Sequence, residues 1–145
     1  MTLRIFLLTS AVALSMSGGI APAIAGGSTI FIEQYGAENQ LGGAQHGHRN
    51  RLTLYQNGYG NTSINSQTGA YNRGVVGQDG KGNFADAYQL GRRNIVGIAQ
   101  FGVGHTAITT QDGYGNAVAV IQAGHRNSAH VTQIGHGNVS VIVQD

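Results

Sequence analysis

Apolar and polar residues alternate in short segments along most of this chain, and the segments recur at a fixed interval. In each segment the positions four and two residues before a glutamine are mostly apolar or small, whereas the positions between them are mixed. A period of two residues is typical of a β-strand, because successive side chains point to opposite faces. The pattern therefore predicts a series of strands whose inward set is these two positions and the glutamine.

Glutamine recurs every eleven residues from position 34 to position 144. Glycine stands two residues after it, and asparagine stands five residues after it in every complete unit except one, where His105 takes its place. The glutamines are Gln34, Gln45, Gln56, Gln67, Gln78, Gln89, Gln100, Gln111, Gln122, Gln133 and Gln144. The glycines are Gly36, Gly47, Gly58, Gly69, Gly80, Gly91, Gly102, Gly113, Gly124 and Gly135. The asparagines are Asn39, Asn50, Asn61, Asn72, Asn83, Asn94, Asn116, Asn127 and Asn138. The fixed period indicates a repeat architecture, and Gly followed by Asn predicts a turn because both tolerate positive φ.

The inward pairs follow a second period of 22 residues. In alternate units the pair is large and apolar, as in Ile30/Ile32, Leu52/Leu54, Val96/Ile98 and Val118/Val120, with Gly74/Val76 and Ser140/Ile142 as weaker members. The pairs between are small or mixed, as in Leu41/Gly43, Ser63/Asn65, Ala85/Ala87, Ala107/Thr109 and Ala129/Val131. A bulky strand that faces a slim strand fills a thin core without voids. We therefore predict an all-β fold, a β-solenoid of about five 22-residue strand–turn–strand repeats plus a terminal half-repeat, with two parallel sheets.

Stacking each strand on its equivalent 22 residues later places Gln above Gln and Asn above Asn, with rungs about 4.8 Å apart. Amide side chains can then hydrogen-bond up and down the stack, which satisfies polar groups inside a narrow core. An amide without a partner there costs about 1–3 kcal/mol. We therefore predict that the glutamines and asparagines form structural ladders.

The first 25 residues differ from the repeat region. Arg4 precedes an apolar stretch over 5–16, and Ala23-Ile24-Ala25 fits the small-x-small rule for cleavage. These features predict a secretory signal peptide over residues 1–25, followed by a repeat domain over residues 26–145. The alternative is a membrane anchor, but the apolar stretch is shorter than the roughly 20 residues that a spanning helix needs.

Composition excludes several classes of protein. Cysteine is absent, which excludes disulfides and thiolate catalysis. Charged residues make up 10% of the chain, too few for a disordered polyelectrolyte, and 24 glycines with 1 proline do not fit a collagen. The net charge of +2 comes from basic residues that are not clustered in sequence, so we predict no nucleic-acid partner.

The candidate chemistry is sparse. Of the six histidines, His46 and His48 form the closest pair, whereas His48 and His136 are predicted to lie several rungs apart. No nucleophile–histidine–acid set is visible, so we predict no catalytic residue, no metal site and no cofactor. The arginines of the repeat region can bind anionic polymers or keep the monomer soluble, and we favour solubility. They are Arg49, Arg51, Arg73, Arg92, Arg93 and Arg126.

The repeat resembles that of a known family. The segment Gln56–Asn61 leading to Gln67, and Gln111–Asn116 leading to Gln122, are similar to the repeat of curlins, the subunits of curli fibres. The resemblance implies a secreted β-solenoid that polymerises into functional amyloid, a fimbrium or pilus-like fibre on the bacterial cell surface. It also implies roles in cell adhesion and biofilm matrix, and as partners other curlin subunits and an outer-membrane curli secretion system. Both a major subunit and a minor, nucleating subunit remain open.

The two end segments predict how subunits join. Thr29–Gln34 and Val139–Gln144 are rich in β-branched residues and contain no proline. Unpaired strand edges of this kind are templates for further strands. We therefore predict homopolymer growth by head-to-tail stacking through these assembly ends. Their apolar residues are Ile30, Ile32, Val141, Ile142 and Val143.

Two other functions compete with a fibre subunit. A monomeric β-solenoid adhesin or binding module, such as an ice-binding protein, needs a uniform outward array, whereas the outward positions here are mixed. A polysaccharide-degrading enzyme needs clustered carboxylates, and the chain has only 6 acidic residues in all. The sequence therefore favours a structural subunit over an enzyme.

Overall fold

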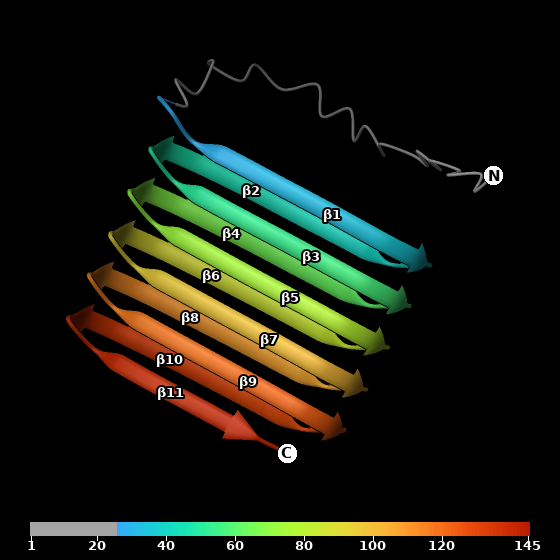
Figure 1. The fold of residues 1–145 in the computed structure, drawn as a ribbon. Helices are drawn as coiled ribbons and strands as arrows, with labels where there is room; N and C mark the ends of the chain where they lie inside the picture. The colour runs from blue at the N-terminus through green and yellow to red at the C-terminus, as the bar shows by residue number, and fades with distance from the viewer. Residues whose placement is uncertain (1–25) are drawn as a thin grey trace, which may run out of the picture.

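The computed structural model describes residues 26–145, so the signal peptide predicted over residues 1–25 lies outside the described residues. The described part of the chain consists of strands joined by short turns (Figure 1). The strands are β1 (Thr29–Ala37), β2 (Gln40–His48), β3 (Arg51–Tyr59), β4 (Thr62–Ala70), β5 (Arg73–Lys81), β6 (Phe84–Arg92), β7 (Ile95–Val103), β8 (Thr106–Tyr114), β9 (Ala117–His125), β10 (Ser128–His136) and β11 (Val139–Gln144). No helix in this part of the chain is long and apolar enough to cross a membrane.

The strands form two sheets that lie face to face. The odd-numbered strands make a six-stranded sheet in the order β1-β3-β5-β7-β9-β11, and the even-numbered strands make a five-stranded sheet in the order β10-β8-β6-β4-β2. Every pair within a sheet is parallel, and each residue pairs with the residue 22 positions later, as Gln34 does with Gln56. The predicted β-solenoid with two parallel sheets and a 22-residue period is thereby confirmed (Figure 1).

A single core of buried apolar side chains runs between the two sheets. It is formed by the predicted inward pairs, with larger residues on the odd strands and mostly alanine on the even strands. The core residues are Leu52, Leu54, Val76, Ala85, Ala87, Val96, Ile98, Ala107, Val118, Val120, Ala129 and Val131. Gly43 of β2 faces the bulky side, where a β-carbon on it would lie 3.3 Å from Cδ2 of Leu52. Bulky and slim strands therefore interlock, as the 22-residue period predicts.

The strands extend further than the alternation indicates. The ten repeat glycines predicted to lie in turns lie instead inside strands, each at the next-to-last position, as Gly36 does in β1. The turn begins two residues later, at the fourth residue after each glutamine, where φ is between 52° and 72° in every unit. Glycine occupies that position in Gly60, Gly82, Gly104, Gly115 and Gly137, and other residues occupy it in Glu38, Arg49, Tyr71, Arg93 and Arg126.

Candidate functional site

The glutamines form two columns inside the molecule, one on each sheet. In both columns Nε2 of each glutamine donates to Oε1 of the glutamine 22 residues later, over 2.7–3.0 Å. Three of these glutamines, for example, are fully buried. Gln56 donates to Gln78 over 2.7 Å, and Gln78 donates to Gln100 over 2.8 Å. All of these bonds run in one direction, with the donor on the N-terminal side.

Each glutamine from Gln45 onward also bonds to the facing sheet, which the sequence analysis did not predict. Its Nε2 donates to the carbonyl oxygen of the residue 16 positions earlier, the first residue of the preceding strand, as Gln56 does to Gln40 over 3.1 Å. In Gln78 the same bond reaches Thr62 over 3.0 Å. Each glutamine amide nitrogen thus bonds both to the next glutamine of its own column and to the backbone of the facing sheet. A side chain shorter than glutamine cannot make both contacts.

The asparagines also stack, but they bond mainly to backbone and not to one another. Oδ1 of Asn50 accepts from the backbone N–H of Asn72 over 3.0 Å. Nδ2 of Asn72 donates to two carbonyls, those of Thr68 near the end of the preceding strand β4 and Gly91 in the next rung. Direct amide–amide bonds occur only near the ends of the described stack, from Asn61 to Asn39 and from Asn138 to Asn116. Each asparagine side chain therefore stabilises both its own turn and the contact with the neighbouring rungs.

His105 stands in the asparagine column and is completely buried. Its backbone N–H donates to Oδ1 of Asn83, and its Nδ1 accepts from the backbone N–H of Asn127 over 3.2 Å. Its Nε2 lies 3.2 Å from the carbonyl oxygen of Phe101. The imidazole thus reproduces most of the bonds of asparagine. The departure from the repeat at this position is accommodated within the ladder.

The predicted assembly ends lie on the outermost strands of the six-stranded sheet, at opposite ends of the described stack (Figure 1). Ile30 and Ile32 point inward but are 43% and 50% exposed, because no rung covers β1. On β11, Ile142 points inward and packs against the core, whereas Val141 and Val143 lie on the outer face and are exposed. Each end therefore presents an open edge with apolar side chains.

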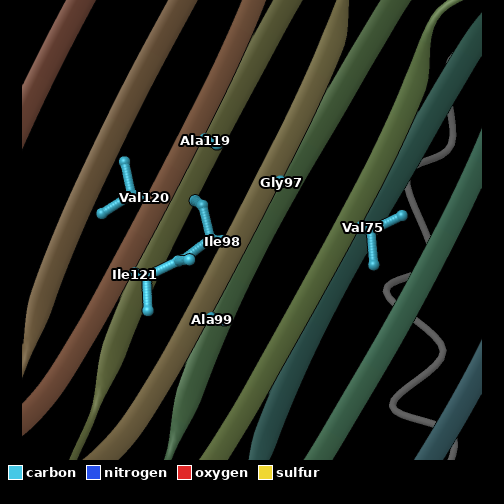
Figure 2. Close-up of a pocket in the computed structure, with 7 residues that line it drawn as sticks. All are labelled: Val75, Gly97, Ile98, Ala99, Ala119, Val120 and Ile121. Atoms are coloured by element: carbon cyan, nitrogen blue, oxygen red, sulfur yellow. The ribbon is translucent and has the colours of Figure 1, made fainter. Parts of the chain in front are cut away.

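The outer face of the six-stranded sheet carries a shallow apolar depression (Figure 2). Its floor forms where Gly97, Ala99 and Ala119 leave little side chain between Val75 and Ile121. No polar side chain lines it.

The histidine and acidic side chains of residues 26–145 are dispersed over the stack. These residues contain no group of three or more His, Cys, Asp or Glu side chains placed to hold a metal ion. His46 and His48 lie on β2, and His136 lies at the end of β10, several rungs away.

Two comparisons with known proteins bear on this geometry. A family model described as the curlin-associated repeat matches residues 80–113 and 104–135. A search of curated proteins finds no match. The matched segments include strands of both sheets, from β6 to β10.

Proposed function

Because this chain belongs to the curlin-repeat family, we propose that it is a structural subunit of extracellular curli-type fibres and not an enzyme. In this proposal residues 1–25 are a signal peptide, and residues 26–145 are the domain that assembles. The fibre lies on the bacterial surface and serves cell adhesion and biofilm matrix. Its partners are further copies of this chain, other curlin subunits and an outer-membrane secretion system.

The observation that carries the proposal is the polarity of the ladders. Every bond between glutamines places the donor on the N-terminal side. The column on the odd strands therefore ends with a side-chain N–H group at Gln144 and begins with Oε1 at Gln34. The asparagines add bonds in both directions, since Oδ1 accepts from the backbone N–H of the next rung and Nδ2 donates to a glycine carbonyl of the next rung. The end near Gln144 is thus complementary to the end near Gln34, and two identical ends are not complementary. This favours head-to-tail growth.

Backbone edges support the same arrangement. In the described chain β1 and β11 each pair on one side only, so each leaves a row of N–H and C=O groups on the other. Parallel strand addition at such an edge satisfies these groups and covers the exposed Ile30 and Ile32. Stacking therefore gains backbone hydrogen bonds and apolar burial in one step.

The test is assembly of the chain spanning residues 26–145, followed by thioflavin T fluorescence and electron microscopy. We expect fibres, and we expect Ile142→Lys to slow their growth strongly, because it places a charge in the core beside the open edge. Val143→Lys is the matched control, since this side chain lies on the outer face. Equal growth of the wild type and Ile142→Lys would contradict the predicted joining surface.

Seeding separates the two subunit roles. Preformed fibres of the chain are added to fresh monomer of the same chain, and the lag time and final fibre mass are measured. A bulk structural subunit extends its own seeds until the monomer is consumed. A chain that only nucleates other subunits leaves most of its monomer in solution.

A further inference from the structure

The fold gathers basic side chains that are dispersed in sequence. Arg49, Arg51, Arg73, Arg92 and Arg93 all lie on the edge where even strands lead into odd strands, at the left of Figure 1. All five are exposed, and they occupy three consecutive levels of the stack. Neighbouring rungs are about 4.8 Å apart, so these five positive charges lie along a short line. We call these five residues the basic edge.

Like charges are placed side by side on the basic edge. Arg51 and Arg73 are direct neighbours in the register of β3 and β5. Arg92 is adjacent in sequence to Arg93, at the end of β6. Like charges directly opposite on paired strands are destabilising. Other odd strands carry Thr29, Ile95 or Ala117 at the position of Arg51, so the fold itself does not require arginine there.

Tyrosines hold two of the guanidinium groups in place. Nη1 of Arg49 donates to the hydroxyl of Tyr71 over 2.9 Å, and its guanidinium carbon lies 5.6 Å from the ring centre. Arg93 makes the same pair of contacts with Tyr114, at 2.6 Å and 5.7 Å. Fixing a guanidinium before binding lowers the entropy lost when an anion is bound. Each of these arginines retains further N–H donors for a ligand.

All but one of the carboxylates of the described chain lie away from the basic edge. Glu38 lies at the opposite edge, in the turn after β1, and Asp145 follows the end of β11 at that edge. Glu33 lies in the middle of β1. Asp79, near the end of β5, lies close to that same edge, and Asp86 lies near the start of β6. Asp112, two residues before Tyr114 on β8, is the acidic residue nearest to the basic edge. The basic edge therefore keeps a strong net positive charge.

We infer that the basic edge binds a linear acidic polysaccharide through its carboxylate groups. Arginine presents a planar fork of donors that matches a carboxylate, and a row of such forks suits a polymer that bears one acidic group after another. Single-stranded nucleic acid is less well matched, because it relies on open aromatic faces for base stacking. Here the ring of Tyr71 is contacted by both Arg49 and His48, and the ring of Tyr114 is contacted by Arg93.

The site is complete in one chain, so it does not depend on fibre formation. The experiment uses the chain of residues 26–145 at low concentration and fluorescently labelled alginate, a polyuronate, with binding followed by fluorescence anisotropy. Dextran of similar length serves as the neutral probe, and a labelled oligodeoxythymidine serves as the nucleic-acid probe. We expect alginate to bind, dextran not to bind, and the alginate affinity to fall steeply as salt is raised.

The variant Arg51→Thr/Arg73→Thr tests the basic edge, because threonine already occupies this position in β1. We expect it to weaken alginate binding about tenfold, as the loss of two surface charge contacts would do. The matched control is Lys81→Ala/Arg126→Gly at the opposite edge, where the net charge changes equally and binding should stay within about twofold. A second variant, Arg49→Gly/Arg93→Gly, retains the fold because glycine occupies the same turn position at Gly115 and Gly137.

Three results would overturn the inference. The first is the absence of alginate binding by the folded wild-type chain. The second is an equal loss of binding in the variants of the two edges, which would indicate attraction by net charge alone. The third is tighter binding of oligodeoxythymidine than of alginate, which would assign the basic edge to nucleic acid.

Discussion

At the scale of single residues, glutamine is the side chain that this fold uses to join rungs and sheets at once. Its two N–H groups serve two purposes, since one donates along the column and the other donates across to the preceding strand. In a buried core these bonds avoid the penalty for burying an amide without a partner. Leucine fits the same volume but can make neither bond. The glutamine column is therefore a specific polar spine within an apolar core.

Replacing Gln78 by leucine tests this spine. The change leaves the amide of Gln56 without its acceptor, removes the donor to Gln100, and removes one bond to the carbonyl of Thr62. We expect the free energy of unfolding to fall by about 2–5 kcal/mol, since up to three buried groups lose a partner. Guanidinium titration followed by circular dichroism measures it. The control is Gln144→Leu at the end strand, which should cost clearly less, and equal costs would contradict the role of the spine.

Asp86 gives a pH-dependent prediction at the same scale. It lies on the outer face of β6 between Ile64 and Ile108, and partial burial raises the pKa of its carboxyl above the usual value. A raised pKa in the folded state means that ionisation opposes folding, so stability falls as pH rises through the folded pKa. We expect Asp86→Asn to raise the melting temperature at neutral pH and to leave it unchanged at about pH 3, where the carboxyl is protonated in both states. A larger gain at low pH than at neutral pH would contradict this cause.

At the scale of strands and turns, backbone approach decides where glycine is needed. Gly80 lies inside β5 with φ of 128°, and a β-carbon on it would overlap the carbonyl oxygen of Gly102 on β7. Gly82, two residues later in the turn, has φ of 63° and open space around it. The first glycine therefore sets the distance between rungs, whereas the second only eases a left-handed turn.

The pair of variants Gly80→Ala and Gly82→Ala separates these two roles. We expect Gly80→Ala to disrupt pairing of β5 with β7 and to abolish cooperative unfolding, because the backbone must move apart. Gly82→Ala should cost only about 1 kcal/mol, the price of a left-handed conformation for a residue with a side chain. Thermal melts monitored by circular dichroism give both values. Similar melting temperatures for the two variants would refute the distinction.

The sequence predicts the repeat, the inward positions and the sheet pairing because they follow from the eleven-residue and 22-residue periods. It does not predict that Gly36 and its equivalents lie inside strands, because alternation stops at the glutamine and positive φ is usually read as a turn. Glycine at Gly60, Gly82 and Gly104 was a signal for the true turn position. Arg49 and Tyr71 at the equivalent position obscured that signal, since bulky residues rarely adopt positive φ.

The glutamine bonds to the facing sheet were also beyond sequence reasoning. They depend on how far apart the two sheets lie, and that distance results from packing of pairs such as Leu52 with Gly43. The role of His105 depends in the same way on local geometry, because only the position of Asn127 shows that the ring nitrogen accepts its N–H. The sequence period gives the order of the residues in a column, whereas packing decides which groups they hydrogen-bond outside it.

At the scale of the whole molecule, the described chain repeats one rung, and in the proposed fibre this stack continues from chain to chain. Each added rung repeats the same pairing, the same glutamine bond and the same core. In that proposed fibre, the energetic gain from one more rung within a chain resembles that from the first rung of the next chain. The central claim is that the glutamine columns continue across the junction between subunits.

Solid-state NMR of mixed fibres tests this claim most directly. Chains of residues 26–145 labelled only with nitrogen-15 are mixed with chains labelled only with carbon-13, and fibres are grown from the mixture. Polarisation transfer from nitrogen-15 to carbon-13 then detects only contacts between different chains. We predict a cross-peak between glutamine side-chain Nε2 of one chain and glutamine side-chain Cδ of another, from the amides near Gln144 and Gln34. Fibres that show contacts between chains only through outer-face residues such as Val75 and Ile121, with no glutamine cross-peak, would contradict the account.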